Sequence, residues 1–366
     1  MALSIGIVGL PNVGKSTLFN ALTKKAVPAE NFPFCTIDPS VGVVAVPDER
    51  LWRLSEFSHT QKTIPAAVEF VDIAGLVKGA ASGEGLGNQF LSHIRETNAI
   101  AQVVRIFDDT NVTHVHGTID PVSDIEVINL ELILADRETI SKRVGNLERD
   151  AKRGVKEAVA LYEVAKKIAH TLESGNLAIH TELSDTEKKL LPQFSLLTTK
   201  PILYVLNKKA GGHNLDETPH DERWIRLMQF LEDGAKPYVV VDARIEDELK
   251  DVAVDDKQTF RQEFGVVTDG IDDLIKAGYR MLGLITYFTT GEKETRAWTI
   301  RDGAKAPEAG AAIHTDFRDT FIRAEVIGTD TLLHAGSYAA AREKGLVRTE
   351  GKEYVVKDGD VIEFKV

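Results

Sequence analysis

The stretch Gly9-Leu10-Pro11-Asn12-Val13-Gly14-Lys15-Ser16 decides the fold of the N-terminal part of this chain. It follows an apolar run at residues 4–8 that predicts a strand, and it precedes a helical pattern at residues 16–23. A glycine-rich turn between a strand and a helix wraps phosphate groups with its backbone amides, and the helix N-terminus adds a partial positive charge. The sequence therefore predicts a phosphate-binding loop.

Two side chains of this loop have roles that follow from their chemistry. Lys15 is placed to reach the β- and γ-phosphates of a nucleoside triphosphate, so we assign it both a binding and a catalytic role. The Ser16 hydroxyl is placed to ligate Mg²⁺. The predicted nucleotide contacts of the loop and the first helical turn are Asn12, Val13, Gly14, Lys15, Ser16 and Thr17.

A second motif, Asp72-Ile73-Ala74-Gly75, begins at the last residue of the strand predicted at residues 68–72. In switch nucleotide hydrolases an aspartate at this point holds Mg²⁺ through water, and the glycine gives its amide to the γ-phosphate. Between the two motifs, Thr36 is the candidate for a further metal ligand, with a plain turn residue as the alternative. The order of the motifs favours Mg²⁺-dependent hydrolysis of a nucleoside triphosphate.

The residue after Gly75 is Leu76, where Ras-type enzymes carry the glutamine that orients the attacking water. A leucine side chain neither donates nor accepts a hydrogen bond, so another group, the backbone with the metal, or a partner must do this work. Candidates are histidines, because imidazole titrates near neutral pH. They are His93, His114 and His116, and a surface or structural role is the alternative for each.

The motif Asn207-Lys208-Lys209-Ala210 stands where guanine-specific hydrolases carry Asn-Lys-x-Asp. That aspartate accepts two hydrogen bonds from guanine, which are worth about 2–4 kcal/mol of base discrimination. Ala210 cannot accept them, and a loss of roughly 3 kcal/mol lowers the preference for guanine by a factor of about 100 or more. We therefore expect ATP to be preferred, with adenine contacted by Asn207 and the Lys208 backbone, and with residues 242–244 behind the base.

Around these motifs, short β-branched runs alternate with helical patterns, which predicts an α/β fold with a mostly parallel sheet. We divide this nucleotide-binding G domain into a first part, residues 1–123, and a second part, residues 201–282. Further strands are predicted at residues 42–46, 103–107, 201–206 and 237–241, and further helices at residues 48–57, 88–97 and 222–232.

Residues 124–200 interrupt this pattern and predict a helical arm. Apolar residues recur at intervals of seven, or multiples of seven, in two tracks. One track contains Ile140 and Ile168, and the other, four residues further on, contains Ala151, Ala158 and Ala165. This predicts a coiled-coil seam between residues 124 and 175 with Gly154 as its weak point. A capping box at Ser184–Glu187 predicts the start of an antiparallel return helix. Residues 139–167 carry eight Lys or Arg against four Asp or Glu, a local charge of +4. This predicts either a solvated helix face or a contact with nucleic-acid phosphates.

Composition excludes several classes of protein. The net charge of −12 argues against a chain that coats nucleic acid over its whole surface. The single cysteine, Cys35, excludes an internal disulfide and a cysteine-based zinc site. No stretch approaches the roughly 20 apolar residues of a membrane span, and the first residues lack the features of a signal peptide. We expect a cytoplasmic monomer without membrane contact.

Past Gly283 the composition shifts to short strands and Gly-rich turns, which predicts a small α+β domain at residues 283–366. Together with the motifs above, the chain resembles the YchF (Obg-like ATPase) family over essentially its whole length. The stretches that carry the resemblance are residues 9–16, 31–36, 72–80, 83–90 and 124–129, and the C-terminal end, which looks like a TGS domain of β-grasp type.

The resemblance implies a G domain with an inserted coiled-coil arm, a TGS domain, Mg²⁺-dependent ATP hydrolysis and association with the ribosome through the arm and the TGS domain. Family members carry a hydrophobic residue at the position of Leu76 and a histidine at His114, which favours His114 as the catalytic histidine. They usually have glutamate at the position of Ala210, so this chain departs from both its family and ordinary GTPases.

Three functions stay open at this point. The first is a slow ATPase that acts as a conformational switch on the ribosome. The second is a nucleotide-sensing ribosome-binding module in which hydrolysis is incidental. The third is a GTPase with unconventional base recognition. Stimulation of turnover by ribosomes separates the first from the second, and base preference separates the third from both.

Overall fold

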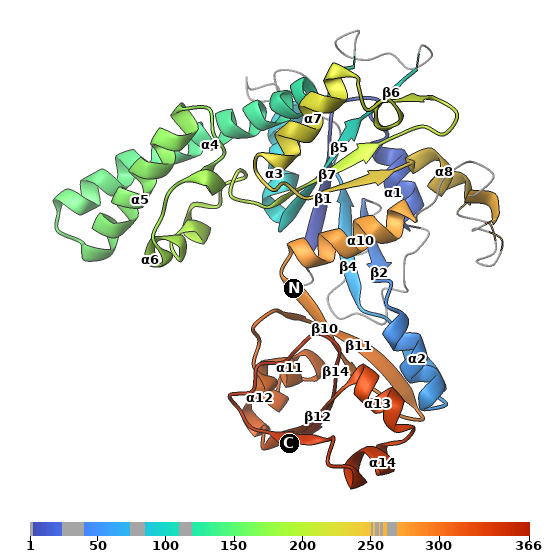
Figure 1. The fold of residues 1–366 in the computed structure, drawn as a ribbon. Coiled ribbons are helices and arrows are strands. Elements are labelled where there is room, and N and C mark those ends of the chain that lie inside the picture. Colours follow the sequence, from blue (N-terminus) through green and yellow to red (C-terminus); the bar gives the residue numbers. More distant parts are fainter. Residues whose placement is uncertain are drawn as a thin grey trace.

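The computed structural model describes residues 3–23, 40–73, 85–109, 119–249, 252, 256, 259–261 and 269–366. They form an α/β domain with a helical arm on one side and a second, smaller domain at the C-terminal end (Figure 1). None of the described helices is both long and apolar enough to cross a membrane.

The first domain is built on a six-stranded sheet in the order β2-β4-β1-β5-β7-β9. All neighbouring strands pair in parallel except β2, which runs antiparallel to β4. The bounds are Ser4–Val8 for β1, Val41–Ala45 for β2, Ala67–Asp72 for β4, Ala99–Arg105 for β5, Ile202–Asn207 for β7 and Tyr238–Val241 for β9. The expected mostly parallel sheet is confirmed, and because its strands are parallel, their carboxyl ends meet at one edge.

Helices cover both faces of this sheet. Alternate side chains of β5 and β7 face opposite ways, so Val104 and Leu206 pack in a core with α7, whereas Val103 and Val205 pack in the core that includes α10. The helices of the domain are α1 (Lys15–Thr23), α3 (Gly85–Glu96), α7 (Glu222–Glu232), α8 (Ala243–Glu248) and α10 (Gly270–Met281). The central strands are therefore buried on both sides, as doubly covered parallel sheets require.

The strand predicted at residues 103–107 ends earlier than expected. β5 stops at Arg105, and Phe107–Asp108 forms β6, which pairs antiparallel with β8 (His213–Asn214) in a separate two-stranded ribbon. This ribbon carries the chain across the carboxyl edge of the main sheet, next to the end of β7.

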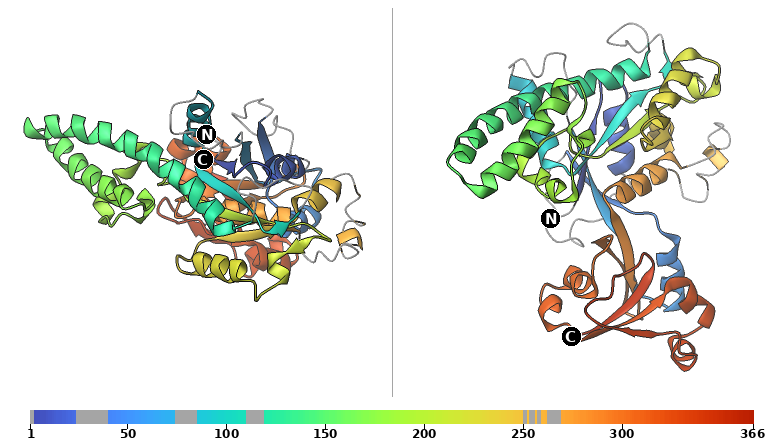
Figure 2. Two further views of the ribbon diagram at one scale, coloured as in Figure 1. Left: turned by 90° about the horizontal axis from the view of Figure 1, so that it is seen from above. Right: turned by 60° about the vertical axis from the view of Figure 1, so that its left-hand side comes forward.

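The arm consists of α4 (Pro121–Lys152) and α5 (Lys156–Glu173), which run side by side away from the sheet (Figures 1 and 2). Residues of both predicted apolar tracks, among them Ile140, Ala165 and Ile168, are buried between the two helices. The prediction of an antiparallel pair is thus confirmed, but the predicted place of the reversal is wrong.

The chain reverses at Gly154, between α4 and α5, and not before Ser184. Gly154 has a φ of +81°, in the left-handed region that glycine adopts at no steric cost, and its amide donates to the Ala151 carbonyl. The predicted capping box at Ser184 is present, but it starts only the short helix α6 (Asp185–Lys188). Pro192 lies in the 3₁₀ turn Leu191–Phe194 that follows, where a longer return helix had been expected.

The second domain contains a mixed six-stranded sheet in the order β13-β12-β14-β10-β11-β3. Five strands come from the C-terminal segment, and four helices accompany them. The strands are β10 (Leu284–Thr289), β11 (Glu294–Arg301), β12 (Arg323–Gly328), β13 (Arg348–Glu350) and β14 (Asp360–Lys365), and the helices are α11 (Ala306–Ile313), α12 (Phe317–Thr320), α13 (Thr329–Ala335) and α14 (Tyr338–Glu343). The predicted α+β domain is present.

The sixth strand of this sheet, β3 (Lys62–Ile64), comes from the first domain and pairs in parallel with β11. The preceding helix α2 (Glu49–Phe57) also reaches the second domain, because Arg50 forms an ion pair of 2.7 Å with Asp358. Residues 49–64 therefore join the two domains through strand pairing and an ion pair. The sequence patterns did not predict these contacts.

Candidate nucleotide-binding site

The candidate site lies at the carboxyl edge of the parallel sheet, where the phosphate-binding loop follows β1. The lysine of this loop is buried and held by its own backbone: the Lys15 ammonium donates to the Leu10 carbonyl at 2.8 Å, and the residue is 8% exposed. Burial lowers the pKa of Lys15 to about 8, and the nearby charge of Asp72 opposes this shift. Lys15 is thus a poorly solvated cation that a phosphate group would stabilise.

Two oxygen side chains meet beside this lysine. The Ser16 hydroxyl hydrogen-bonds to the Asp72 carboxylate, and burial raises the pKa of Asp72 while Lys15 and this hydrogen bond oppose the rise. Hard oxygen donors of this kind suit Mg²⁺, which keeps several waters and takes few protein ligands. Within the described ranges no cluster of three or more His, Cys, Asp or Glu side chains is suited to hold a metal. Both residues thus fit a Mg²⁺ ion that is completed by phosphate and water.

The affinity of the site for nucleotide is expected to fall at alkaline pH. Phosphate oxygens favour the charged form of Lys15, so the pKa of Lys15 is higher with nucleotide bound than the value of about 8 in the free protein. Below about pH 8, Lys15 is protonated with and without nucleotide, so nucleotide affinity does not change with pH through this group. Above about pH 8, the affinity for nucleotide falls by up to about tenfold per pH unit. Calorimetric titration with ADP and Mg²⁺ from about pH 7 to pH 10 measures this slope. A Lys15→Met control removes the titrating group, so an equally steep decline in that variant would contradict the assignment.

The loop is tied to the end of β7 by Asn207. The Asn207 side-chain amide donates to the Val13 carbonyl at 2.8 Å, and its oxygen accepts from the Ala243 amide at 3.1 Å. Gly14 has a φ of +98°, and a Cβ on it would lie 2.3 Å from the Asn207 amide nitrogen. Glycine is therefore required here, because the backbone approaches the asparagine too closely for any side chain.

The structure places the predicted base-reading motif between the ends of β7 and β9. The Lys208 amide donates to the Val241 carbonyl at 2.9 Å, and the Ala210 amide donates to the Asp242 carboxylate. Asp242 also caps α8 by accepting from the Arg244 amide at 3.1 Å. Position 210 thus lies beside residues 242–244, and its methyl side chain has no acceptor for a base.

A cavity of about 290 Å³ opens between these segments. The phosphate-binding loop, the ribbon, the end of β7 and the start of α8 all contribute to it. Its lining residues are Asn12, Gly14, Thr17, Phe107, Asp109, Asn207, Lys208, Lys209, Ala243 and Arg244. The cavity joins three of the predicted loop contacts, Asn12, Gly14 and Thr17, with residues of the predicted base motif, so it is the candidate pocket for base and sugar.

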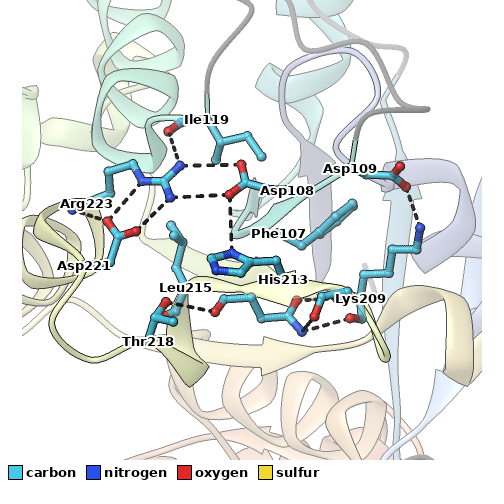
Figure 3. Close-up of polar contacts among 12 residues, drawn as sticks. Phe107, Asp108, Asp109, Ile119, Lys209, His213, Leu215, Thr218, Asp221 and Arg223 are labelled. Atoms are coloured by element: carbon cyan, nitrogen blue, oxygen red, sulfur yellow. Dashed lines mark hydrogen bonds and ion pairs between the residues drawn. The ribbon is translucent and has the colours of Figure 1, made fainter.

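Phe107, Asp109 and Lys209 are cavity residues that the sequence patterns did not single out. Phe107 and Asp109 follow β5, whose neighbour in the sheet is β7. An ion-pair network fixes the ribbon that carries them: Arg223 on α7 contacts Asp221 at 2.7 Å and Asp108 at 3.4 Å, and Asp108 contacts His213 at 3.5 Å (Figure 3). The signal that could have found them is the rule that ligands bind where parallel strands end.

Several predicted site residues lie outside the described residues: Thr36, Gly75, Leu76, His114 and His116. Their roles therefore stay predictions. His93, the third histidine candidate, is exposed on α3.

Comparison with known proteins agrees with this geometry. Residues 4–135 match the family model MMR_HSR1, described as a 50S ribosome-binding GTPase, and residues 284–366 match the model YchF-GTPase_C, described as a protein of unknown function (DUF933). The chain is 51% identical over 365 residues to a protein of Bacillus subtilis strain 168 named ribosome-binding ATPase YchF. It is 47% identical over 367 residues to the protein of that name from Escherichia coli O157:H7, and each match covers 100% of this chain and 99% of the relative.

A solved structure shows the same arrangement of domains. The YchF GTPase of Schizosaccharomyces pombe superposes with a TM-score of 0.87 at 36% sequence identity, and the match covers 100% of this chain and 98% of that one. The G domain, the arm and the C-terminal domain are therefore common to both proteins.

Proposed function

This chain belongs to the YchF family, and we propose that it binds and slowly hydrolyses ATP with Mg²⁺, as a conformational switch that acts on the ribosome. The observation that carries the proposal is the pairing of an intact phosphate site with a base motif that lacks its carboxylate. Lys15, Ser16 and Asp72 come together at the end of the sheet, whereas Ala210 leaves the guanine-reading position without an acceptor.

Each residue of the phosphate site has a distinct task in this proposal. Lys15 neutralises charge on the β- and γ-phosphates, and the loop amides with the N-terminus of α1 hold the phosphate chain. Ser16 and Asp72 would hold Mg²⁺, which would supply further neutralisation of phosphate charge. Gly75 binds the γ-phosphate, and His114 positions the attacking water in place of the side chain that Leu76 lacks. Because the water-orienting glutamine is missing at position 76, turnover by the free protein is slow.

The ribosome is the proposed partner, and the arm is the proposed contact. The B. subtilis and E. coli relatives are named for ribosome binding, and the basic stretch of this chain lies at the tip of the arm, where α4 turns into α5. Lys152 and Arg153 are exposed there, in surface pairs with Glu148 and Asp150. Ion pairs exposed to water contribute little to the stability of the fold. These lysine and arginine side chains can therefore leave their acidic partners and bind rRNA phosphates instead. A protein bound to ribosomes in this way works in the cytoplasm, and we propose the C-terminal domain as a second contact.

Charge reversal at the arm tip tests this function. The triple variant Lys152→Glu, Arg153→Glu, Lys156→Glu is expected to bind ribosomes about tenfold more weakly and to lose any stimulation of ATP turnover by ribosomes, because it places acidic groups against phosphate. ATP turnover by the free variant should be unchanged, since these residues lie on the arm and not at the phosphate site. Co-sedimentation and a phosphate-release assay with and without ribosomes measure both effects.

A matched variant adds positive charge on α4, beside the residues of the triple variant. Glu148→Lys with Asp150→Lys should strengthen ribosome binding and make it more sensitive to salt. Unchanged co-sedimentation of both variants would remove the arm from the proposal. ATP turnover that ribosomes do not stimulate in the wild-type protein would instead favour a nucleotide-sensing module.

A further inference from the structure

A carboxylate and an ammonium group face each other in the base cavity. The Asp109 carboxylate and the Lys209 ammonium lie 2.5 Å apart (Figure 3). Both residues line the cavity. The Asp109 side chain is 8% exposed and that of Lys209 is 28% exposed, so the pair lies largely out of water. A shielded ion pair at a binding cavity is strong enough to read a ligand, because little solvent competes with it.

The Asp109 side of the pair is held rigidly by a buried arginine. Arg105, at the end of β5, is 1% exposed. Its side chain donates to the Phe107 carbonyl at 3.0 Å and to the Asp109 carbonyl at 3.3 Å, and its guanidinium lies 4.6 Å from the centre of the Phe107 ring. The backbone of residues 107–109 is therefore fixed before a ligand binds.

The Lys209 side of the pair is fixed by Asn214 on the ribbon. The Lys209 amide donates to the Asn214 side-chain oxygen at 2.9 Å, and the Asn214 side-chain amide donates back to the Lys209 carbonyl at 2.8 Å. The two charged residues thus project from two neighbouring, braced segments into one cavity. Preorganisation of this kind raises affinity because little ordering is needed on binding.

The residues first expected to read the base are engaged elsewhere. One amide hydrogen and the oxygen of the Asn207 side chain bond to Val13 and Ala243, and the Lys208 amide bonds to Val241. Ala210 has no polar side chain. The Arg244 guanidinium is directed to Glu248 at 2.9 Å, and its side chain is 68% exposed. Asp109 and Lys209 therefore stand out as the shielded charged pair that can reach a base edge.

We infer that Asp109 and Lys209 form the base-reading pair of this protein, in place of the carboxylate missing at position 210. The inference rests on the proposed ATPase function and names the residues that select adenine. On its pairing edge adenine presents an amino donor next to a ring-nitrogen acceptor, and Asp109 and Lys209 present the complementary acceptor and donor. Guanine would place its C6 carbonyl oxygen against the carboxylate, which repels it.

The test uses ATP and purine riboside triphosphate, an analogue that lacks only the amino group. Because a hydrogen bond to a charged group strengthens binding by about tenfold or more, wild-type protein is expected to bind ATP at least about tenfold more tightly than the analogue, with Mg²⁺ present. Equal affinities would overturn the inference without the use of any variant. Tighter binding of GTP than of ATP would instead overturn the proposed function, so the two failures are distinguishable.

The variant Asp109→Ala tests whether the Asp109 carboxylate is the group that recognises the amino group of adenine. It should lose at least about tenfold in ATP affinity and change the affinity for the analogue by less than about twofold, because the analogue makes no bond to the carboxylate. Retained analogue binding also shows that the variant is folded. Equal losses for both ligands, or no loss for either, would mean that Asp109 does not read the amino group. Lys209→Met provides a second variant, and an unchanged ratio of ATP to GTP affinity in it would remove Lys209 from the pair.

Discussion

Replacing Lys15 with alanine is expected to lower ATP turnover by about a hundredfold to a thousandfold, which is the loss typical when a preorganised charge-stabilising group is removed. Lys15 is the buried cation of the phosphate site, and its ammonium lies against the Leu10 carbonyl. Negative charge on the transferring phosphoryl group then meets a fixed positive charge in a place with little water. The measurement is steady-state phosphate release with saturating ATP and Mg²⁺.

The stability of this variant separates catalysis from folding. Burial lowers the pKa of Lys15, which means that the charged lysine is poorly accommodated in the free protein. Lys15→Ala should therefore unfold at the same temperature as the wild type or at a higher one. Lys152→Ala on the exposed arm is the matched control and should keep full turnover by the free protein. A loss of turnover below about tenfold in Lys15→Ala would contradict the assigned role.

Replacing Ala210 with aspartate is expected to shift base preference toward guanine by about a hundredfold, because the new carboxylate can accept two hydrogen bonds from the guanine edge. The backbone of position 210 is already held for this purpose, since its amide donates to Asp242 beside the cavity. The measurement is the ratio of the dissociation constants for ATP and GTP in the variant and in the wild type.

Ala210→Asn is the control for this variant. Asparagine has nearly the shape of aspartate but carries no charge, so it should shift the ratio much less. If Ala210→Asp and Ala210→Asn give the same ratio as the wild type, position 210 does not face the base, and the account of the missing guanine contact fails.

Local motifs made the phosphate site predictable from sequence. Lys15 and Ser16 belong to one continuous loop, and Asp72 ends a recognisable apolar strand, so their chemistry can be identified without a fold. Asp109 and Lys209 are 100 residues apart in the chain and meet because β5 and β7 are neighbours in the sheet. Strand order is a property of the whole fold, and a local pattern does not contain it.

The arm shows a different limit of sequence patterns. The track that contains Ala151, Ala158 and Ala165 keeps its spacing of seven straight through the turn at Gly154. When two helices are joined by a short turn, the apolar residues can keep the same seven-residue spacing that they would have in one long helix. The periodicity therefore predicted the apolar seam but not the point where the chain reverses. The pairing of β3 with β11 escaped prediction for the same reason as the base cavity, because its partners are more than 200 residues apart.

The central claim is that this site takes ATP in preference to GTP because position 210 lacks a carboxylate and Asp109 with Lys209 reads adenine. The measurement that tests it most directly is the equilibrium affinity of the purified wild-type protein for ATP and for GTP, side by side, with Mg²⁺. We predict that ATP binds at least about tenfold more tightly, as the charged hydrogen bond to its amino group requires. Tighter binding of GTP would contradict the claim and would mean that other residues of the cavity read guanine.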